Sequence, residues 1–162
     1  MNESHLTLRR ATEQDMMLYF EWANDPVVRQ NAFSQEPIPL EAHKSWFAKK
    51  LADKNTVMYV LESDGVPAGQ IRFDLVEPHL FEIGYTIASE FRGKGLGTVI
   101  LQTSTQQLER DKALFKPFTM RGVVKQENIP SCKAFLSAGY EEKNNLQPYT
   151  TTSLRYFYRN LL

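Results

Sequence analysis

Residues 81–108 constrain the fold of this chain more than any other stretch. Phe81–Ile87 is rich in aromatic and β-branched residues, which predicts a strand. A helix is predicted further on, because apolar side chains recur near helical spacing at Val99, Leu101, Thr105 and Leu108. Between them, Arg92–Gly97 places three glycines directly before the helix. Glycines let a ligand approach the backbone, and a helix N-terminus favours an anion, so this unit predicts a pyrophosphate cradle.

The spacing of these glycines decides between several phosphate-binding motifs. A Walker A loop needs Ser or Thr after its lysine, whereas Lys94 is followed by Gly95. The dinucleotide fingerprint needs G-x-G-x-x-G, and the glycines here stand at 93, 95 and 97. The pattern that fits is [Q/R]-x-x-G-x-G, which is similar to the acetyl-CoA signature of the GNAT superfamily of N-acetyltransferases. The alternative is an ordinary glycine-bearing loop between strand and helix, but the preceding Glu-Ile-Gly-Tyr strand and the long helix favour the signature.

The composition excludes several other classes of protein. Nineteen Lys and Arg residues balance 19 Asp and Glu residues in a chain of 162, which does not favour a nucleic-acid partner. Residues 1–5 have no charged and apolar leader pattern, and no apolar run is long enough to span a bilayer. The single cysteine, Cys132, cannot form an internal disulfide. We therefore expect a cytoplasmic protein without a membrane partner.

The order of predicted elements is strand, two helices, three antiparallel strands, helix, strand, helix and two strands. This order resembles the GNAT fold along almost the whole chain. The resemblance implies an α/β (α+β) fold and one domain over residues 1–162, with a mixed, mostly antiparallel central sheet of about seven strands flanked by helices. The predicted elements cover Leu6–Arg10, Thr12–Ala23, Pro39–Leu51, Val57–Glu62, Gly69–Val76, Phe81–Ile87, Val99–Leu108, Pro117–Val124, Asn128–Ala138, Tyr140–Lys143 and Leu154–Leu161, and Val27–Phe33 is expected to be a short helix or a turn.

The resemblance also implies which residues bind acetyl-CoA. The backbone of the glycine turn would hold the pyrophosphate, with a lysine adding charge, and the end of the preceding strand would pair with the pantetheine amides. A later Asn-x-x-Ser stretch resembles the family helix that contacts the pantetheine arm, although Asn128 also suits a helix N-cap. No metal is expected, since three histidines and one cysteine form no ligand cluster in the sequence. The implied cofactor residues are Tyr85, Thr86, Ile87, Arg92, Gly93, Lys94, Gly95, Leu96, Gly97, Thr98, Asn128 and Ser131.

Acetyl transfer to an amine needs a base for the amine and a proton for the leaving thiolate. Glu82, on the cofactor strand, is the predicted base, against a solvated glutamate or one paired with an arginine such as Arg72. Phe135 stands where many relatives place a tyrosine acid, so Tyr140 or another tyrosine, water, or no acid at all remain open. Phe135 also leaves open a non-catalytic module that binds acetyl-CoA. Cys132 is expected in the core, with an acyl-carrying nucleophile as the alternative.

The acceptor is read from the N-terminal half. The stretch from Trp22 to Arg29 also occurs in acetyltransferases that act on ribosomal-protein N-termini. The longer combination with Phe33 and the His43-x-x-Trp46 helix is similar to PseH-type enzymes, which acetylate a UDP-linked 4-amino-4,6-dideoxy sugar in pseudaminic acid synthesis. The absence of a strongly acidic face argues against cationic aminoglycosides or polyamines.

The resulting expectation is a ternary complex of acetyl-CoA with a UDP-amino sugar. Arg29 and His43 would bind the diphosphate, and Trp22 or Phe33 would provide an apolar wall, while Trp46 is expected mainly in the core. A homodimer is a further expectation, because relatives with this fold commonly dimerise.

Overall fold

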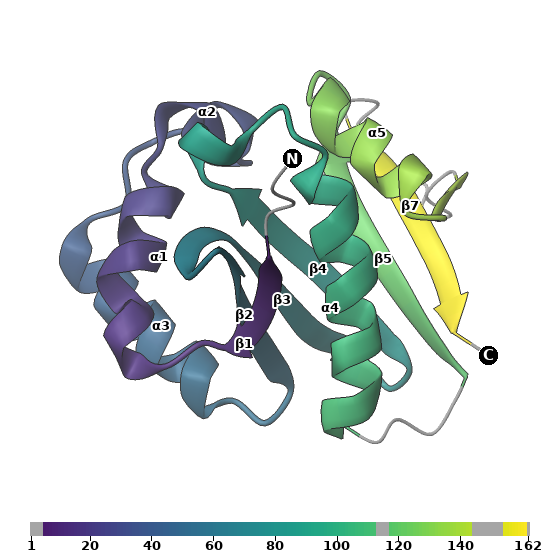
Figure 1. Cartoon of the computed structure of the whole chain (residues 1–162), viewed down its shortest axis with the longest axis horizontal. Helices are drawn as coiled ribbons and strands as arrows, with labels where there is room; N and C mark the ends of the chain where they lie inside the picture. The colour runs from purple at the N-terminus through teal and green to yellow at the C-terminus, as the bar shows by residue number, and fades with distance from the viewer. Residues whose placement is uncertain (1–4, 113–116, 144–153, 162) are drawn as a thin grey trace.

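The computed structural model describes residues 5–112, 117–143 and 154–161, and it places one seven-stranded sheet at the centre of the chain (Figure 1). The strands lie in the order β1-β2-β3-β4-β5-β7-β6. All neighbours are antiparallel except β4 and β5, which are parallel. The mixed, mostly antiparallel sheet predicted from the sequence is thereby confirmed. The strands are β1 (Leu6–Arg10), β2 (Thr56–Ser63), β3 (Val66–Glu77), β4 (Leu80–Ile87), β5 (Phe118–Lys125), β6 (Glu141–Lys143) and β7 (Leu154–Leu161).

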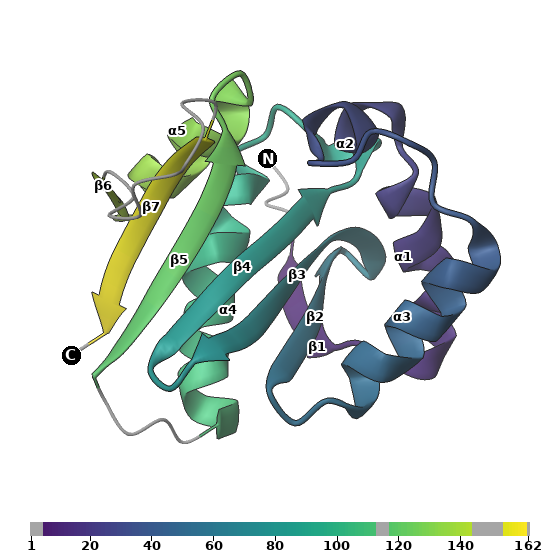
Figure 2. The same cartoon turned by 180° about the vertical axis from the view of Figure 1, so that it is seen from behind.

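The strands β4 and β5 separate toward their C-terminal ends (Figure 2). They pair only from Leu80 to Ile83 of β4, opposite Thr119 to Gly122 of β5. From Gly84 onward β4 keeps its partner β3 but no longer pairs with β5. Beyond the split, one edge of β4 therefore carries backbone groups that the sheet does not bond.

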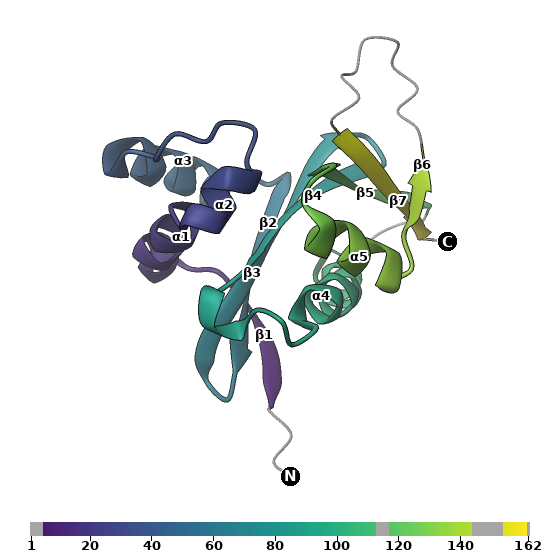
Figure 3. The ribbon, with the colours of Figure 1, turned by 90° about the horizontal axis from the view of Figure 1, so that it is seen from above.

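Helices cover both faces of the sheet, and Figure 3 shows α1, α2 and α3 on one side with α4 and α5 on the other. Of the first group, α1 and α3 pack on a small cluster that includes Tyr19, Phe47 and Val60. The second group covers the main core, in which Ile100, Leu101 and Leu108 of α4 are fully buried. The helices are α1 (Met16–Ala23), α2 (Pro26–Asn31), α3 (Leu40–Ala52), α4 (Leu96–Lys112) and α5 (Ile129–Ser137), with short 3-10 turns at Glu13–Asp15 and Ser89–Phe91.

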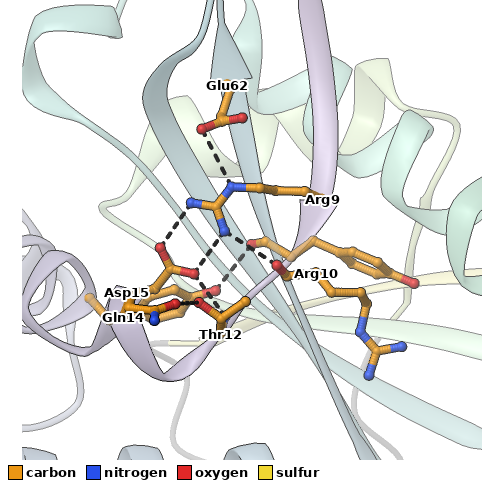
Figure 4. Close-up of polar contacts among 8 residues, drawn as sticks. Arg9, Arg10, Thr12, Gln14, Asp15 and Glu62 are labelled. Atoms are coloured by element: carbon orange, nitrogen blue, oxygen red, sulfur yellow. Dashed lines mark hydrogen bonds and ion pairs between the residues drawn. The ribbon is translucent and has the colours of Figure 1, made fainter.

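A polar cluster anchors the start of the first helical layer to β1 (Figure 4). Asp15 is buried and accepts hydrogen bonds from both terminal nitrogens of Arg9, each at 2.8 Å. The Asp15 carboxylate also accepts the Thr12 backbone N–H at 2.8 Å, which forms the capping box of this turn. Arg9 further contacts Glu62 of β2 at 3.4 Å.

All predicted helices and strands that fall on described residues are present, with shifted ends. The central helix extends past Leu108 to Lys112. Pro39 is the N-cap of α3 rather than its first helical residue. Gly139 adopts the left-handed conformation expected of a C-terminal glycine, with φ 95°. Residues 1–4, part of the N-terminal stretch interpreted above, lie outside the described residues.

Candidate active site

A cavity of about 1210 Å³ opens where β4 and β5 separate. Residues 83–87 of β4 line it on one side of the split and Val123–Lys125 of β5 on the other. It also reaches α2 and α3 on one face of the sheet, and the starts of α4 and α5 on the other face. A ligand in this cavity can therefore contact both helical layers.

The glycine turn before α4 has the geometry of an anion cradle. Gly93 and Gly95 both adopt φ 77°, a conformation that favours glycine, and a Cβ at either position would meet nothing within 4 Å. The first N–H groups of α4, which begins at Leu96, have no intrahelical partner. Arg92 ties the turn to its surroundings, because its Nε donates to the Ile87 carbonyl at 3.1 Å and its Nη2 lies 3.1 Å from Asp25.

The unpaired edge of β4 and the start of α5 complete this side of the cavity. Asn128 caps α5, since its Oδ1 accepts the Ser131 backbone N–H at 3.4 Å, and both residues line the cavity. The Ser131 hydroxyl is hydrogen-bonded to the Tyr85 hydroxyl at 3.0 Å. An open glycine turn, a helix N-terminus and a free strand edge fit the diphosphate and the amide-bearing arm of CoA.

Eleven of the twelve residues assigned to cofactor binding from the sequence line this one cavity. The exception is Lys94, which is exposed and places its Nζ 5.5 Å from the centre of the Phe91 ring. The eleven are Tyr85, Thr86, Ile87, Arg92, Gly93, Gly95, Leu96, Gly97, Thr98, Asn128 and Ser131.

Glu82, the predicted base, lies just beyond the cavity floor and is not itself a lining residue. Cross-strand pairs of β3 and β4 form that floor, Gln70 with Thr86 and Arg72 with Gly84. Glu82 is two residues before Gly84 on the same face of the strand, one pair beyond the lining. Its carboxylate accepts a hydrogen bond of 2.6 Å from Arg121 of β5, so its arginine partner is Arg121 and not Arg72.

Tyr140 does not reach the cavity. It is 3% exposed, packs against Phe135 with ring centres 5.0 Å apart, and is not among the lining residues. Burial raises the pKa of its phenol to about 12. The tyrosine with a hydroxyl beside the cavity-lining Ser131 is instead Tyr85.

The two residues predicted to bind a diphosphate are already engaged by the protein backbone. Arg29 lines the cavity, but its Nε donates to the Ala23 carbonyl at 2.7 Å. Its Nη1 donates to the carbonyls of Ser34 and Glu36 at 3.0 and 3.2 Å. His43 is 2% exposed and its Nε2 donates to the Met16 carbonyl at 3.0 Å. Burial lowers the pKa of His43, so its ring is neutral at pH 7.

The aromatic residues divide between core and cavity. Trp22 belongs to the cluster around Tyr19 and does not line the cavity, so the predicted wall role does not fit it. Phe33 does line the cavity and is 69% exposed. Trp46, expected in the core, contacts that cluster but also lines the cavity, where the Arg72 guanidinium lies 5.1 Å from its ring centre.

Arg72 is the cavity residue that the sequence analysis passed over as a binding group. A sequence signal for this role existed: Arg72 and Gly84 lie on two predicted neighbouring strands, and an arginine can lie across a glycine there. The register of β3 and β4 does pair these two residues. Cys132, in contrast, lies where it was expected. It is 1% exposed in the main core, and burial raises the pKa of its thiol.

The described residues contain no group of three or more His, Cys, Asp or Glu side chains that could hold a metal ion. None of their helices is both long enough and apolar enough to cross a membrane.

Comparison with known proteins places this geometry among the acetyltransferases. The model of the acetyltransferase (GNAT) domain matches residues 5–141. A comparison with curated protein sequences finds no match. Among solved structures, a domain from Methanocaldococcus jannaschii superposes with a TM-score of 0.81 at 21% identity, over 98% of this chain and 100% of that chain.

Two further structures contain bound ligands. A spermidine N-acetyltransferase from Vibrio cholerae, in complex with CoA and spermine, has a TM-score of 0.79 at 18% identity and covers 96% of this chain and 95% of its own. The acetyltransferase AAC(6')-Ib, in complex with ribostamycin and coenzyme A, has a TM-score of 0.78 at 19% identity and covers 95% and 92%. At these identities the likeness shows the shared fold.

Proposed function

Since the chain belongs to the acetyltransferase (GNAT) domain family and is thus an acetyl-CoA-dependent N-acetyltransferase, we propose that its acceptor is the amine of a nucleotide-linked amino sugar. The second candidate acceptor is a protein N-terminus, because the stretch from Trp22 to Arg29 resembles enzymes of that kind. Both acceptors would occupy the part of the cavity between α2, α3 and the β3–β4 floor, on the face opposite α4 and α5.

The charge of the cavity is the observation that favours the nucleotide sugar. Among the described lining residues, Glu127 is the one acidic side chain, against the five basic side chains of Arg29, Arg72, Arg92, Lys125 and Lys133. A cavity with this excess of positive charge attracts phosphates and repels polycations. On the face of α2 and α3 the lining cations include Arg29 and Arg72, and no described acidic side chain of α2, α3, β3 or β4 lines the cavity. This part of the lining therefore supports an anionic acceptor over a polyamine or an aminoglycoside.

The reaction forms an amide C–N bond and breaks a thioester C–S bond. The acceptor ammonium must lose two protons, one before attack and one from the tetrahedral adduct, while the leaving sulfur gains one, so one proton is released in net. We assign the proton lost before attack to Glu82, whose carboxylate is held by Arg121 one cross-strand pair beyond the cavity floor. We assign the proton that joins the sulfur to the Tyr85 hydroxyl, which is bonded to the cavity-lining Ser131 and takes the place of an acid at Phe135. The proton lost from the adduct then returns Tyr85 to its neutral form.

The test is release of free CoA thiol from acetyl-CoA with a panel of acceptors. UDP-4-amino-4,6-dideoxy-N-acetylhexosamine, an N-terminal peptide, spermidine and kanamycin would be compared at equal concentrations. We expect the UDP-sugar to give the highest kcat/KM. A higher value for the peptide would replace the first candidate with the second. A higher value for spermidine or kanamycin would exclude both and show that the basic lining does not select the acceptor.

A further inference from the structure

The acceptor side of the cavity contains an arginine held in a fixed position by its neighbours. Arg72 lies on β3 between Trp46 and Gly84, with its Cζ 5.1 Å from the centre of the Trp46 ring. A Cβ at Gly84 would stand 3.2 Å from its Nη2, so the guanidinium fits there because residue 84 has no side chain. An aromatic face on one side and bare backbone on the other restrict the orientation of the guanidinium plane.

The bonding of Arg72 leaves its terminal nitrogens available. Its Nε donates to Asp74 at 2.7 Å. Among the described contacts, no acceptor lies on Nη1 or Nη2 of Arg72. Asp74 also accepts hydrogen bonds from Lys50 at 2.9 Å and Thr56 at 2.8 Å. One carboxylate thus faces two cations, and this cluster keeps a net positive charge beside the cavity.

The other basic groups near the acceptor do not have this property. The guanidinium of Arg29 donates to three backbone carbonyls, and His43 is neutral and bonded to Met16. Arg92 is paired with Asp25 beside the glycine turn. Arg72 alone in this comparison presents a rigid fork of N–H donors, the geometry that binds phosphate or carboxylate through two parallel hydrogen bonds.

We propose that the terminal nitrogens of Arg72 bind an oxyanion of the acceptor, and that this contact makes Arg72 the main determinant of acceptor specificity. The inference rests on the proposed function in that it places the acceptor on this face of the sheet. It does not depend on the oxyanion being a nucleotide phosphate, because a carboxylate near the amine presents the same two oxygens. Arg72 alternates along β3 with Ile71 and Phe73 of the main core, so its side chain lies on the other face of the sheet, against Trp46 of α3. We therefore assign its oxyanion to the acceptor rather than to the pyrophosphate of CoA at the glycine turn.

The test compares two acceptors in the same enzyme variant, so a loss of activity that affects both acceptors equally cancels in the ratio of their kcat/KM values. Two acceptor pairs differ only in the anion: the amino sugar 1-phosphate against the free amino sugar, and a peptide with Asp beside its amine against the same peptide with Asn. For each pair, kcat/KM of the charged member is divided by that of the uncharged member, in the wild type and in R72Q and R72K. Thermal unfolding of each variant checks that it folds.

We expect R72Q to lower this ratio about 10- to 100-fold for at least one pair, the range for charge-assisted hydrogen bonds. R72K, which keeps the charge without the fork, should fall between R72Q and the wild type. A loss confined to the sugar pair identifies a phosphate, and a loss confined to the peptide pair identifies a carboxylate. The latter supports Arg72 as the oxyanion site while rejecting the nucleotide sugar. A ratio in R72Q equal to that of the wild type for both pairs would overturn the proposal. So would an R72K ratio higher than or equal to the wild-type ratio, because a lysine lacks the two parallel N–H donors.

Discussion

Two tyrosines lie close to Phe135, and their surroundings give them different chemistry. Tyr140 stacks edge-on against Phe135 within the core, on the side away from the cavity. Tyr85 contacts the same ring at a centroid distance of 5.8 Å but bonds Ser131 at 3.0 Å, and both of these residues line the cavity. Burial raises the pKa of Tyr85 above its usual value of 10.0, so its hydroxyl keeps its proton at neutral pH. A proton donor needs this protonation state.

Replacing Tyr85 with Phe removes that hydroxyl and leaves the ring contact with Phe135. We expect kcat to fall about 100-fold or more, within the range for general acid catalysis. Y140F is the matched control, because it removes a hydroxyl that does not reach the cavity, and we expect its kcat to stay near that of the wild type. The measurement is steady-state thiol release with the acceptor that proves most active. A kcat of Y85F as close to the wild type as that of Y140F would show that the Tyr85 hydroxyl does not donate the proton.

A second change at a single residue tests the proposed base. Glu82→Gln keeps a hydrogen bond to Arg121 but cannot accept a proton from the amine. We expect kcat to fall about 100- to 10,000-fold, with the KM for acetyl-CoA unchanged. Glu142→Gln is the control, since Glu142 is also a strand glutamate bonded to an arginine, Arg155, at 2.7 Å. Turnover of E82Q close to that of E142Q would remove Glu82 from the mechanism.

At the scale of elements, a polar cluster joins β1 to the 3-10 turn that precedes α1 (Figure 4). The Asp15 carboxylate joins this turn to β1 through Arg9, and it closes the capping box through the Thr12 N–H. The hydrogen bonds from Arg9 hold the pKa of Asp15 below its usual value, although burial opposes the shift. The same contacts therefore contribute to the free energy of unfolding.

The Asp15→Asn variant should lose about 1–2 kcal/mol of unfolding free energy at pH 7, toward the low end because Arg9 is partly exposed. Because the folded pKa is lowered, this stabilisation is fully present above the unfolded pKa of about 3.9 and is lost as pH falls through the folded pKa. Urea unfolding at pH 7 and at decreasing acid pH measures both effects. Glu62→Gln, which removes the longer contact of 3.4 Å to Arg9, should cost less than D15N. A D15N deficit that persists undiminished into acid would contradict this account.

At the scale of the whole molecule, the charges are balanced in number but not in position. The chain has 19 basic and 19 acidic residues, yet basic side chains dominate the described lining of the cavity. Acidic side chains lie outside the lining. Asp15 and Glu62 pair with Arg9 of β1, and Asp74 pairs with Arg72 without lining the cavity itself. A neutral protein can therefore attract anionic substrates to one side.

This separation predicts that substrate affinity depends on salt. Between about 20 and 200 mM ionic strength we expect the KM for acetyl-CoA to rise several-fold, of the order of 3- to 10-fold, as screening weakens the attraction. Lys133→Ala, at an exposed position in the lining, should flatten this dependence. Lys49→Ala, at an exposed position on α3 outside the lining, should leave it unchanged. A KM that does not respond to salt would show that the basic lining has no role in attracting the cofactor.

Local patterns in the sequence were sufficient to predict the helices, the strands and the glycine turn, whereas the cofactor residues were implied by the family resemblance. Alternation, helical spacing, capping residues and turn glycines act over a few residues, which is the range that a pattern can report. The glycine turn and the Asn128 cap were located in this way, and both line the cavity. The family resemblance added the mixed, mostly antiparallel sheet of about seven strands, which the pairing of distant segments confirms.

Only the tertiary structure decided which polar side chains remain available to a ligand. His43 bonds the carbonyl of Met16, 27 residues away, and Tyr85 bonds Ser131, 46 residues away. Arg29 resembles a ligand-binding arginine in sequence, but carbonyls of the folded loop occupy its donors, while Arg72 keeps its terminal nitrogens among the described contacts. Hydrogen-bond satisfaction depends on which distant segments the fold brings together, and a one-dimensional pattern does not contain that information.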